Sequence, residues 1–144
     1  MQVAEQLNLP VFLHCRDAFE DFHRIISKYP KVPKCVHCHT DDDANHLQQL
    51  LQLDCFIGIT GWVCDNRRGK GLASLMNMIP LNRLFVETDG PFLLPRNMPQ
   101  PYPKENEAAY LGWVVKGISD VTGIVEKEIA VATTKNAIDF FNLK

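Results

Sequence analysis

Four short apolar runs recur along the chain, and each is followed by a stretch with the periodicity of an amphipathic helix. The runs are about five residues long, start roughly 20 to 30 residues apart, and lie at 11–15, 34–39, 55–59 and 84–88. Strands that are apolar on both faces and alternate with helices form parallel sheets covered by helices. The pattern therefore predicts an α/β fold, and strands of this length occur both in (β/α)-barrels and in doubly wound sheets.

The helices are predicted from apolar residues spaced three and four positions apart. The expected segments are 1–8, 18–28, 44–53, 72–78 and 107–122, and the segment 126–141 is expected to form one or two further helices. No linker or low-complexity tract interrupts this order, so we expect a single domain over residues 1–144.

Composition limits the classes of function and the cell compartment. The net charge of −2 gives no general attraction to nucleic acids or to membrane surfaces, so any contact with nucleic acid must come from a local cluster or a metal ion. Five cysteines, an odd number lying mostly in apolar runs, are typical of reduced thiols. Without an apolar run of membrane-spanning length or a signal-like amino terminus, we expect a cytoplasmic protein with no membrane partner, or a nuclear one in a eukaryote.

Three of the four predicted strands end in a residue that can bind a metal ion: His14, His37 and Asp89. The carboxyl ends of parallel strands lie at one edge of the sheet, so these side chains are expected to meet there. Histidine nitrogen and carboxylate oxygen suit Zn²⁺ or Mn²⁺, and Mg²⁺ where carboxylates and phosphates predominate. A single histidine at a strand end more often just hydrogen-bonds in the core, but three equivalent placements favour a metal site.

Glu87 lies two residues before Asp89, so both acids share one face of an apolar strand. Such a strand carries two acids inward only if a cation, a proton or a hydrogen-bond donor meets them.

Other polar residues after the strands are candidates for substrate contacts. His39 is on the face of His37 if the strand continues, and the sequence leaves open whether it is a second ligand, a substrate contact or a polar residue at the mouth. Arg16, directly behind His14, is the better candidate for binding a phosphate, and Arg96 is a further one. Trp62 either closes over a ligand or simply packs. His23 and His46 are assigned to the helix surface.

The pair Cys35 and Cys38 has the spacing of a zinc or redox motif. No second Cys or Cys/His pair stands at a suitable distance, so we interpret both as small core residues.

Several segments together resemble the TatD-like deoxyribonuclease family, most closely its bacterial TatD branch. The resemblance covers nearly the whole chain, and its joint motifs are specific; they lie at 9–18, 36–38, 57–65, 86–91, 94–96 and 133–141. It implies a TIM barrel of the metal-dependent hydrolase superfamily that cleaves ester bonds, here the phosphodiester bonds of DNA, as an exonuclease. The family's metal ligands correspond to His14, His37 and Asp89, and Asp89 would also help to orient or deprotonate the attacking water. The implied cofactors are divalent cations, Mg²⁺, Mn²⁺ or Zn²⁺.

The chain also departs from the family pattern. It matches only the last four βα units of an eight-stranded barrel, which needs at least about 200 residues. The amino-terminal His-x-His strand and a glutamate from a middle strand are absent, so we expect a domain truncated at its N-terminal side. Within the matched part, the family usually has other residues at His39, Asp41, Glu105 and Ala108, so local substrate contacts are expected to differ.

A half barrel leaves two strand edges and part of its apolar interior exposed. We therefore expect pairing with a second copy or with a complementary N-terminal half. The alternative functions are an inactive half-barrel that acts as an interaction partner, a truncated gene product, or a related reaction on another ester or amide bond.

Overall fold

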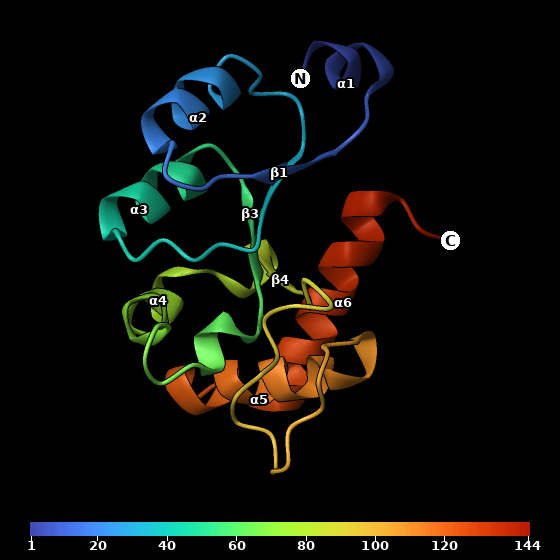
Figure 1. Cartoon of the computed structure of the whole chain (residues 1–144). Helices are drawn as coiled ribbons and strands as arrows, with labels where there is room; N and C mark the ends of the chain where they lie inside the picture. Colours follow the sequence, from blue (N-terminus) through green and yellow to red (C-terminus); the bar gives the residue numbers. More distant parts are fainter.

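The centre of the computed structural model, which describes residues 1–144, is a parallel sheet of four strands (Figure 1). The strands follow each other in the order β1-β2-β3-β4, and their bounds are β1 (Val11–His14), β2 (Lys34–His37), β3 (Phe56–Ile59) and β4 (Leu84–Val86). Sequential order without a reversal is the order of a (β/α)-barrel, whereas a doubly wound sheet has a switch point. The predicted α/β fold of about four βα units is confirmed, with strands one or two residues shorter than expected.

Six α-helices accompany the sheet. They are α1 (Gln2–Leu7), α2 (Phe19–Ile26), α3 (Ala44–Gln52), α4 (Lys70–Leu75), α5 (Leu111–Thr122) and α6 (Glu126–Phe141). The segment 126–141, which the sequence left as one or two helices, is a single continuous helix. Short 3₁₀ turns lie at Gly61–Cys64, Met76–Met78, Leu81–Arg83 and Ala108–Tyr110. No helix is long and apolar enough to cross a bilayer.

The main core lies between the outer face of the sheet and the helices. Parallel pairing aligns Val36 with Ile57 and Ile57 with Leu84, so these side chains form one apolar row across the sheet. Residues of α2 to α6 pack on this row and are almost fully buried, among them Ile26, Leu47, Leu50, Leu72, Ile118 and Ile129. Apolar residues of α2 to α6 thus face the sheet, whereas Val3 and Leu7 of α1 are exposed.

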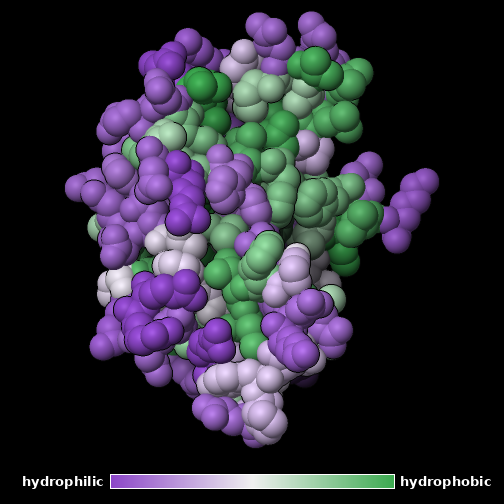
Figure 2. All heavy atoms as spheres, viewed as in Figure 1, coloured by the Kyte–Doolittle hydropathy of each residue, from purple (hydrophilic) through white to green (hydrophobic).

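The inner face of the sheet carries an aromatic layer. Phe56 and Phe85 stack with ring centroids 4.8 Å apart, and Phe140 from α6 meets each of them edge-on at 5.2 Å. Toward β1 this layer is open, since Phe12 is 50% exposed. Exposed apolar residues of the carboxyl-terminal segment, Ile138, Phe141 and Leu143, lie beside it around a groove lined by Phe12. Figure 2 shows an apolar band running down this side of the molecule between polar flanks.

Asn136 joins α6 to the beginning of β4. Its side-chain amide donates hydrogen bonds to the carbonyl oxygens of Leu81 and Leu84, at 2.7 and 2.8 Å. The side chain is largely buried, so water cannot replace these bonds.

Replacing Asn136 by alanine is expected to lower the free energy of unfolding by about 2–3 kcal/mol, because two carbonyl groups lose their partner. Urea denaturation measures this change. The adjacent variant Lys135→Ala removes only an exposed ion pair with Asp139 and is expected to cost less than about 1 kcal/mol. Equal losses in the two variants would contradict this role of Asn136.

Candidate functional site

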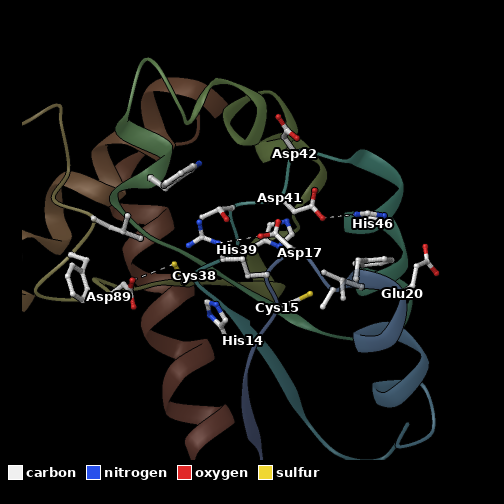
Figure 3. A pocket seen from close by; sticks show the side chains of 18 residues that line it. His14, Cys15, Asp17, Glu20, Cys38, His39, Asp41, Asp42, His46 and Asp89 are labelled. Carbon is white, nitrogen blue, oxygen red and sulfur yellow. Dashed lines mark hydrogen bonds and ion pairs between the residues drawn. The ribbon is translucent and has the colours of Figure 1, made fainter.

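A pocket of about 800 Å³ opens at the carboxyl ends of the strands (Figure 3). Its walls are the loops after β1, β2 and β4, with Trp62 contributed by the turn after β3. The predicted residues among its lining are His14, Arg16, His39, Trp62 and Asp89.

His14 and His37 are side by side because their strands pair in register. Parallel pairing sets His14 opposite His37, and His14 Nδ1 lies 3.1 Å from His37 Nε2. The ring of Phe12 stacks on His37 with centroids 4.9 Å apart. Burial lowers the pKa of His37, and the neighbouring His14 lowers it further while Asp89 opposes the shift. The two imidazoles therefore form a pair in which His37 favours its neutral form.

Three of the loops lining the pocket contain a residue other than glycine in the left-handed region. These are Asp17 after β1, Cys38 after β2, and both Asp89 and Leu93 after β4, with φ values of 54°, 50°, 56° and 52°. Such conformations are uncommon for residues with a side chain and are concentrated at functional sites. In Figure 3 the Cys38 thiol points to Asp89, and its sulfur lies 3.7 Å from Asp89 Oδ2.

Asn106 holds the loop that carries Asp89. Its side-chain nitrogen lies 2.8 Å from the carbonyl oxygens of Thr88 and Phe92 and 3.2 Å from that of Leu93. Its backbone N–H donates to the carbonyl of Pro91 at 2.9 Å. One buried asparagine thus organises the turn on which Asp89 lies.

The imidazole pair has a spacing that suits two ligands of one ion. With metal–nitrogen bonds of about 2.1 Å, two ligands of a tetrahedral ion are about 3.4 Å apart, close to the observed 3.1 Å. However, no group of three or more His, Cys, Asp or Glu side chains is arranged to hold a metal ion. The chain therefore provides a suitable pair of nitrogen donors, and Asp89 does not join them as a third donor in this arrangement.

Glu87 contacts the imidazole pair, a role that sequence analysis did not assign to it. Its Oε1 accepts a hydrogen bond from the backbone N–H of Cys38 and lies 3.8 Å from His37 Nδ1. Burial raises the pKa of Glu87 to about 7; the Cys38 N–H opposes this shift and the charge of Asp89 adds to it. The sequence feature that could have indicated this role is the position of Glu87 on the same strand face as Asp89.

His39 does not continue the alternation of β2, because Cys38 turns the chain out of the strand. His39 is 4% exposed, and its Nε2 has no hydrogen-bond partner. Burial lowers its pKa, and the charges that act on it are those of Asp41 and His46. If β2 continued, His37 and His39 would lie on the same face. This predicted arrangement is therefore wrong.

His46 was assigned to the surface, and this assignment is wrong. Its Nδ1 lies 2.7 Å from Asp41 Oδ2, and its ring stacks on Phe19 with centroids 3.7 Å apart. Both His46 and Asp41 line the pocket, where a dashed line joins them in Figure 3. Helical periodicity places His46 on the polar side of α3. It contains no information about the preceding loop, in which Asp41 lies.

The remaining predicted contacts have different surroundings. Arg16 lines the pocket with its side chain 80% exposed, 3.8 Å from Asp17. Trp62 is half-buried, and the guanidinium of Arg68 lies 4.4 Å from the centroid of its ring. Arg96 lies over the ring of Tyr102 and is not part of the pocket lining.

All five cysteines are free, and Cys35 and Cys38 are buried. Burial and the charges of Asp89 and Glu87 raise the pKa of Cys38 to about 12, so its thiol stays protonated. This agrees with the interpretation of both residues as core residues.

Comparison with known proteins identifies the family. The family model described as TatD related DNase matches residues 1–142. The chain belongs to this family. The 3'-5' ssDNA/RNA exonuclease TatD of Erwinia tasmaniensis is 44% identical over 146 aligned positions, which cover 99% of this chain and 56% of the relative. The TatD exonuclease of Citrobacter rodentium is 40% identical, with 99% and 55% covered.

Solved structures of TatD proteins share the fold. The TatD homologue YJJV of Escherichia coli superposes with a TM-score of 0.84 at 23% identity, over 99% of this chain and 54% of that protein. A TatD family hydrolase of Entamoeba histolytica gives 0.80 at 19% identity, with 99% and 56% covered. This TatD-family chain thus spans about half the length of the relatives it matches.

The loop after β3 in this TatD-family chain depends on Asp65. The buried carboxylate of Asp65 accepts hydrogen bonds from the backbone N–H groups of Arg67 and Arg68 and from Arg68 Nε. The Arg67 N–H is the largest of the causes that lower the pKa of Asp65 to about 2; burial opposes this shift, and the hydrogen bonds and charge of Arg68 lower the pKa further.

Because its folded pKa is depressed, Asp65 contributes stability that is present above about pH 4 and is lost as the pH falls to about 2. Asp65→Asn cannot ionise, so its free energy of unfolding should fall less steeply across this interval. Denaturation at a series of pH values measures the slope, with the neighbouring exposed Asn66→Ala as control. An unchanged slope in Asp65→Asn would contradict the assignment.

Proposed function

We propose that the chain is part of a metal-dependent hydrolase that cleaves the phosphodiester bonds of DNA as an exonuclease. The observation that carries the proposal is the contact between His14 and His37 at the pocket that Asp89 also lines, in a chain matched by the TatD family over residues 1–142. The relatives' name, 3'-5' ssDNA/RNA exonuclease, extends the substrates to be tested to single-stranded DNA and RNA.

His14, His37 and Asp89 are the residues that we propose to hold the divalent cation, Mg²⁺, Mn²⁺ or Zn²⁺. When bound, such an ion lowers the pKa of a water and neutralises charge on the phosphate. Asp89 in this proposal orients the water and accepts its proton. The left-handed backbone at Asp89 and the bonds from Asn106 to its loop hold this residue at the pocket.

The proposed substrate contacts are Arg16, His39, Trp62 and Arg96. Arg16 is charged and exposed in the pocket, as an arginine that binds a phosphate oxygen must be. His39 and Trp62 line the pocket, and each has a buried ring nitrogen without a hydrogen-bond partner. Arg96 lies beyond the pocket lining, so its proposed contact is with a more distant phosphate.

We propose that this chain alone has only part of the active site. Its two imidazoles touch, yet no third donor completes a cluster, and the relatives are nearly twice as long. A complementary half-barrel, corresponding to the part of the relatives that this chain does not cover, would supply the remaining donors. The incomplete donor set also favours the second candidate, an inactive half-barrel that serves as an interaction partner.

Nuclease assays separate the two candidates. The chain alone is expected to degrade a 5'-labelled single-stranded DNA slowly with Mg²⁺ or Mn²⁺, and faster after addition of the uncovered part of the Erwinia tasmaniensis relative. Asp89→Asn is expected to reduce the stimulated rate at least about 100-fold. The control Asp120→Asn, in an exposed ion pair on α5, is expected to keep it.

Absence of stimulated cleavage would favour the inactive half-barrel. Robust cleavage by the chain alone that Asp89→Asn abolishes would contradict the proposal of a partial site. Small esters assayed in parallel test the related hydrolase reaction.

The open inner face is proposed to be the surface that this complementary half covers. The sheet has two edges, at β1 and β4, and an apolar groove runs between Phe12 and α6. Without its partner such a face is expected to drive pairing of two copies.

Size-exclusion chromatography with light scattering is therefore expected to give a mass above that of one chain. Ile138→Glu, a charge placed in the groove, is expected to shift the protein toward the monomer. Val125→Glu changes an equally apolar, exposed residue outside the groove and should leave the association unchanged. A folded wild-type monomer would contradict self-association.

A further inference from the structure

Phe92 is an apolar ring at the mouth of the pocket that the chain leaves largely uncovered. It is 68% exposed, more than any other of the exposed large apolar residues. Of that group it alone lines the pocket, whose other walls include His14, Arg16 and Asp89. The ring therefore borders the same space as the residues proposed to bind a metal ion and a phosphate.

The backbone that carries this ring is fixed, although the ring itself is free. In the loop after β4, the Phe92 N–H donates to the carbonyl oxygen of Asp89 at 3.0 Å, and the Phe92 carbonyl oxygen lies 2.8 Å from Asn106 Nδ2. Asn106 is 5% exposed, so water has little access to this bond. A ring held on such a backbone loses little conformational entropy when a ligand stacks on it.

The turn that carries Trp62 packs directly against this loop. A Cβ atom on Gly61 would collide with the carbonyl oxygen of Leu93, so only glycine permits this close approach. Trp62, the next residue, also lines the pocket, and the guanidinium of Arg68 lies over its ring. Two adjoining turns thus present aromatic side chains to one pocket, and Phe92 is the more exposed of the two.

The groups around Phe92 indicate what would stack on it. An exposed aromatic ring suits a flat partner, and Arg16 in the same pocket suits a phosphate. A nucleotide unit combines a flat base with a phosphate. We propose that Phe92 is a stacking platform for a base of single-stranded nucleic acid, whose adjoining phosphate enters the pocket. The choice of a nucleotide as the ligand rests on the proposed function.

Stacking on Phe92 requires a base with an uncovered face. In a duplex each base is covered by its neighbours, whereas an unpaired base can splay out and stack on an aromatic side chain. Every base has a π-face, so such stacking tolerates any sequence. Phe92 thus favours single strands over duplexes without reading their sequence.

Fluorescence anisotropy with labelled strands measures what the bases contribute to binding. The probes are a short oligothymidylate and an abasic strand of the same length, which carry the same number of phosphates, and EDTA prevents cleavage. The wild-type chain is expected to bind the oligothymidylate at least about 5-fold more tightly than the abasic strand, the lower end of the range for one stacked base.

Variants of Phe92 test whether this ring is the platform. Phe92→Ala is expected to weaken binding of the oligothymidylate at least about 5-fold and to leave binding of the abasic strand unchanged. Phe92→Trp retains an aromatic face and is expected to bind the oligothymidylate at least as tightly as the wild type. The control is Val125→Ala, which shortens a 65% exposed apolar residue outside the pocket. Because the ring of Phe92 is exposed, Phe92→Ala is expected to unfold at the urea concentration of the wild type.

Three results would overturn the proposal. They are a wild-type chain that binds both strands equally, an unchanged affinity of Phe92→Ala for the oligothymidylate, and equal weakening of both strands in Phe92→Ala. If Phe92→Ala instead weakens only the assembly with the uncovered part of the Erwinia tasmaniensis relative, Phe92 is an interface residue and the proposal is wrong.

Nuclease assays on the same proteins separate this proposal from the proposed function. Cleavage of single-stranded DNA without base binding that depends on Phe92 would contradict the stacking platform alone. Base binding that depends on Phe92, without cleavage by the assembled halves, would contradict the nuclease activity alone.

Discussion

The register between β1 and β2 is the constraint on which the site depends. Parallel pairing sets His14 opposite His37, and both strands end at these residues, so their imidazoles meet at the mouth of the sheet. A shift by one residue would turn one ring into the apolar outer layer, where Val36, Ile57 and Leu84 pack against the helices. Core packing and the geometry of the imidazole pair are therefore set by the same pairing.

The inner face combines apolar side chains with ionisable groups. Phe56, Phe85 and Phe140 fill the part near the beginning of the strands, while Glu87 and the imidazoles lie near their ends. Burying a carboxylate beside an aromatic layer is costly unless donors meet it. The Cys38 N–H is such a donor, and Gly58 leaves space for the carboxylate, which lies 3.8 Å from His37 Nδ1.

The two faces of the sheet differ in how completely this chain covers them. In the matched TatD structures this chain corresponds to slightly more than half of the protein, and here the sheet ends at β1 and β4. Helices cover the outer face, but Phe12 remains half exposed on the inner one. The outer layer thus has its packing within this chain, while the inner layer remains partly exposed.

The sequence by itself determined the four strands, most of the helices and the gathering of His14 and Asp89 at one pocket. These follow from local periodicity and from the rule that parallel strands end at one edge. Even the contact between His14 and His37 follows once the strands pair in order. The length of α6 was left open, because Thr133 and Thr134 weaken helix propensity and only packing of α6 against β4 and α5 decides it.

Only the tertiary structure decided how the other polar residues are paired. The left-handed turn at Cys38 separates His39 from His37. The charges that act on His39 are therefore those of Asp41 and His46. Arg96 lies over the ring of Tyr102, outside the pocket. Glu87 is 49 positions from the Cys38 N–H that it binds. Such partners depend on the path of loops between strands, and side-chain periodicity within a strand or helix contains no information about that path.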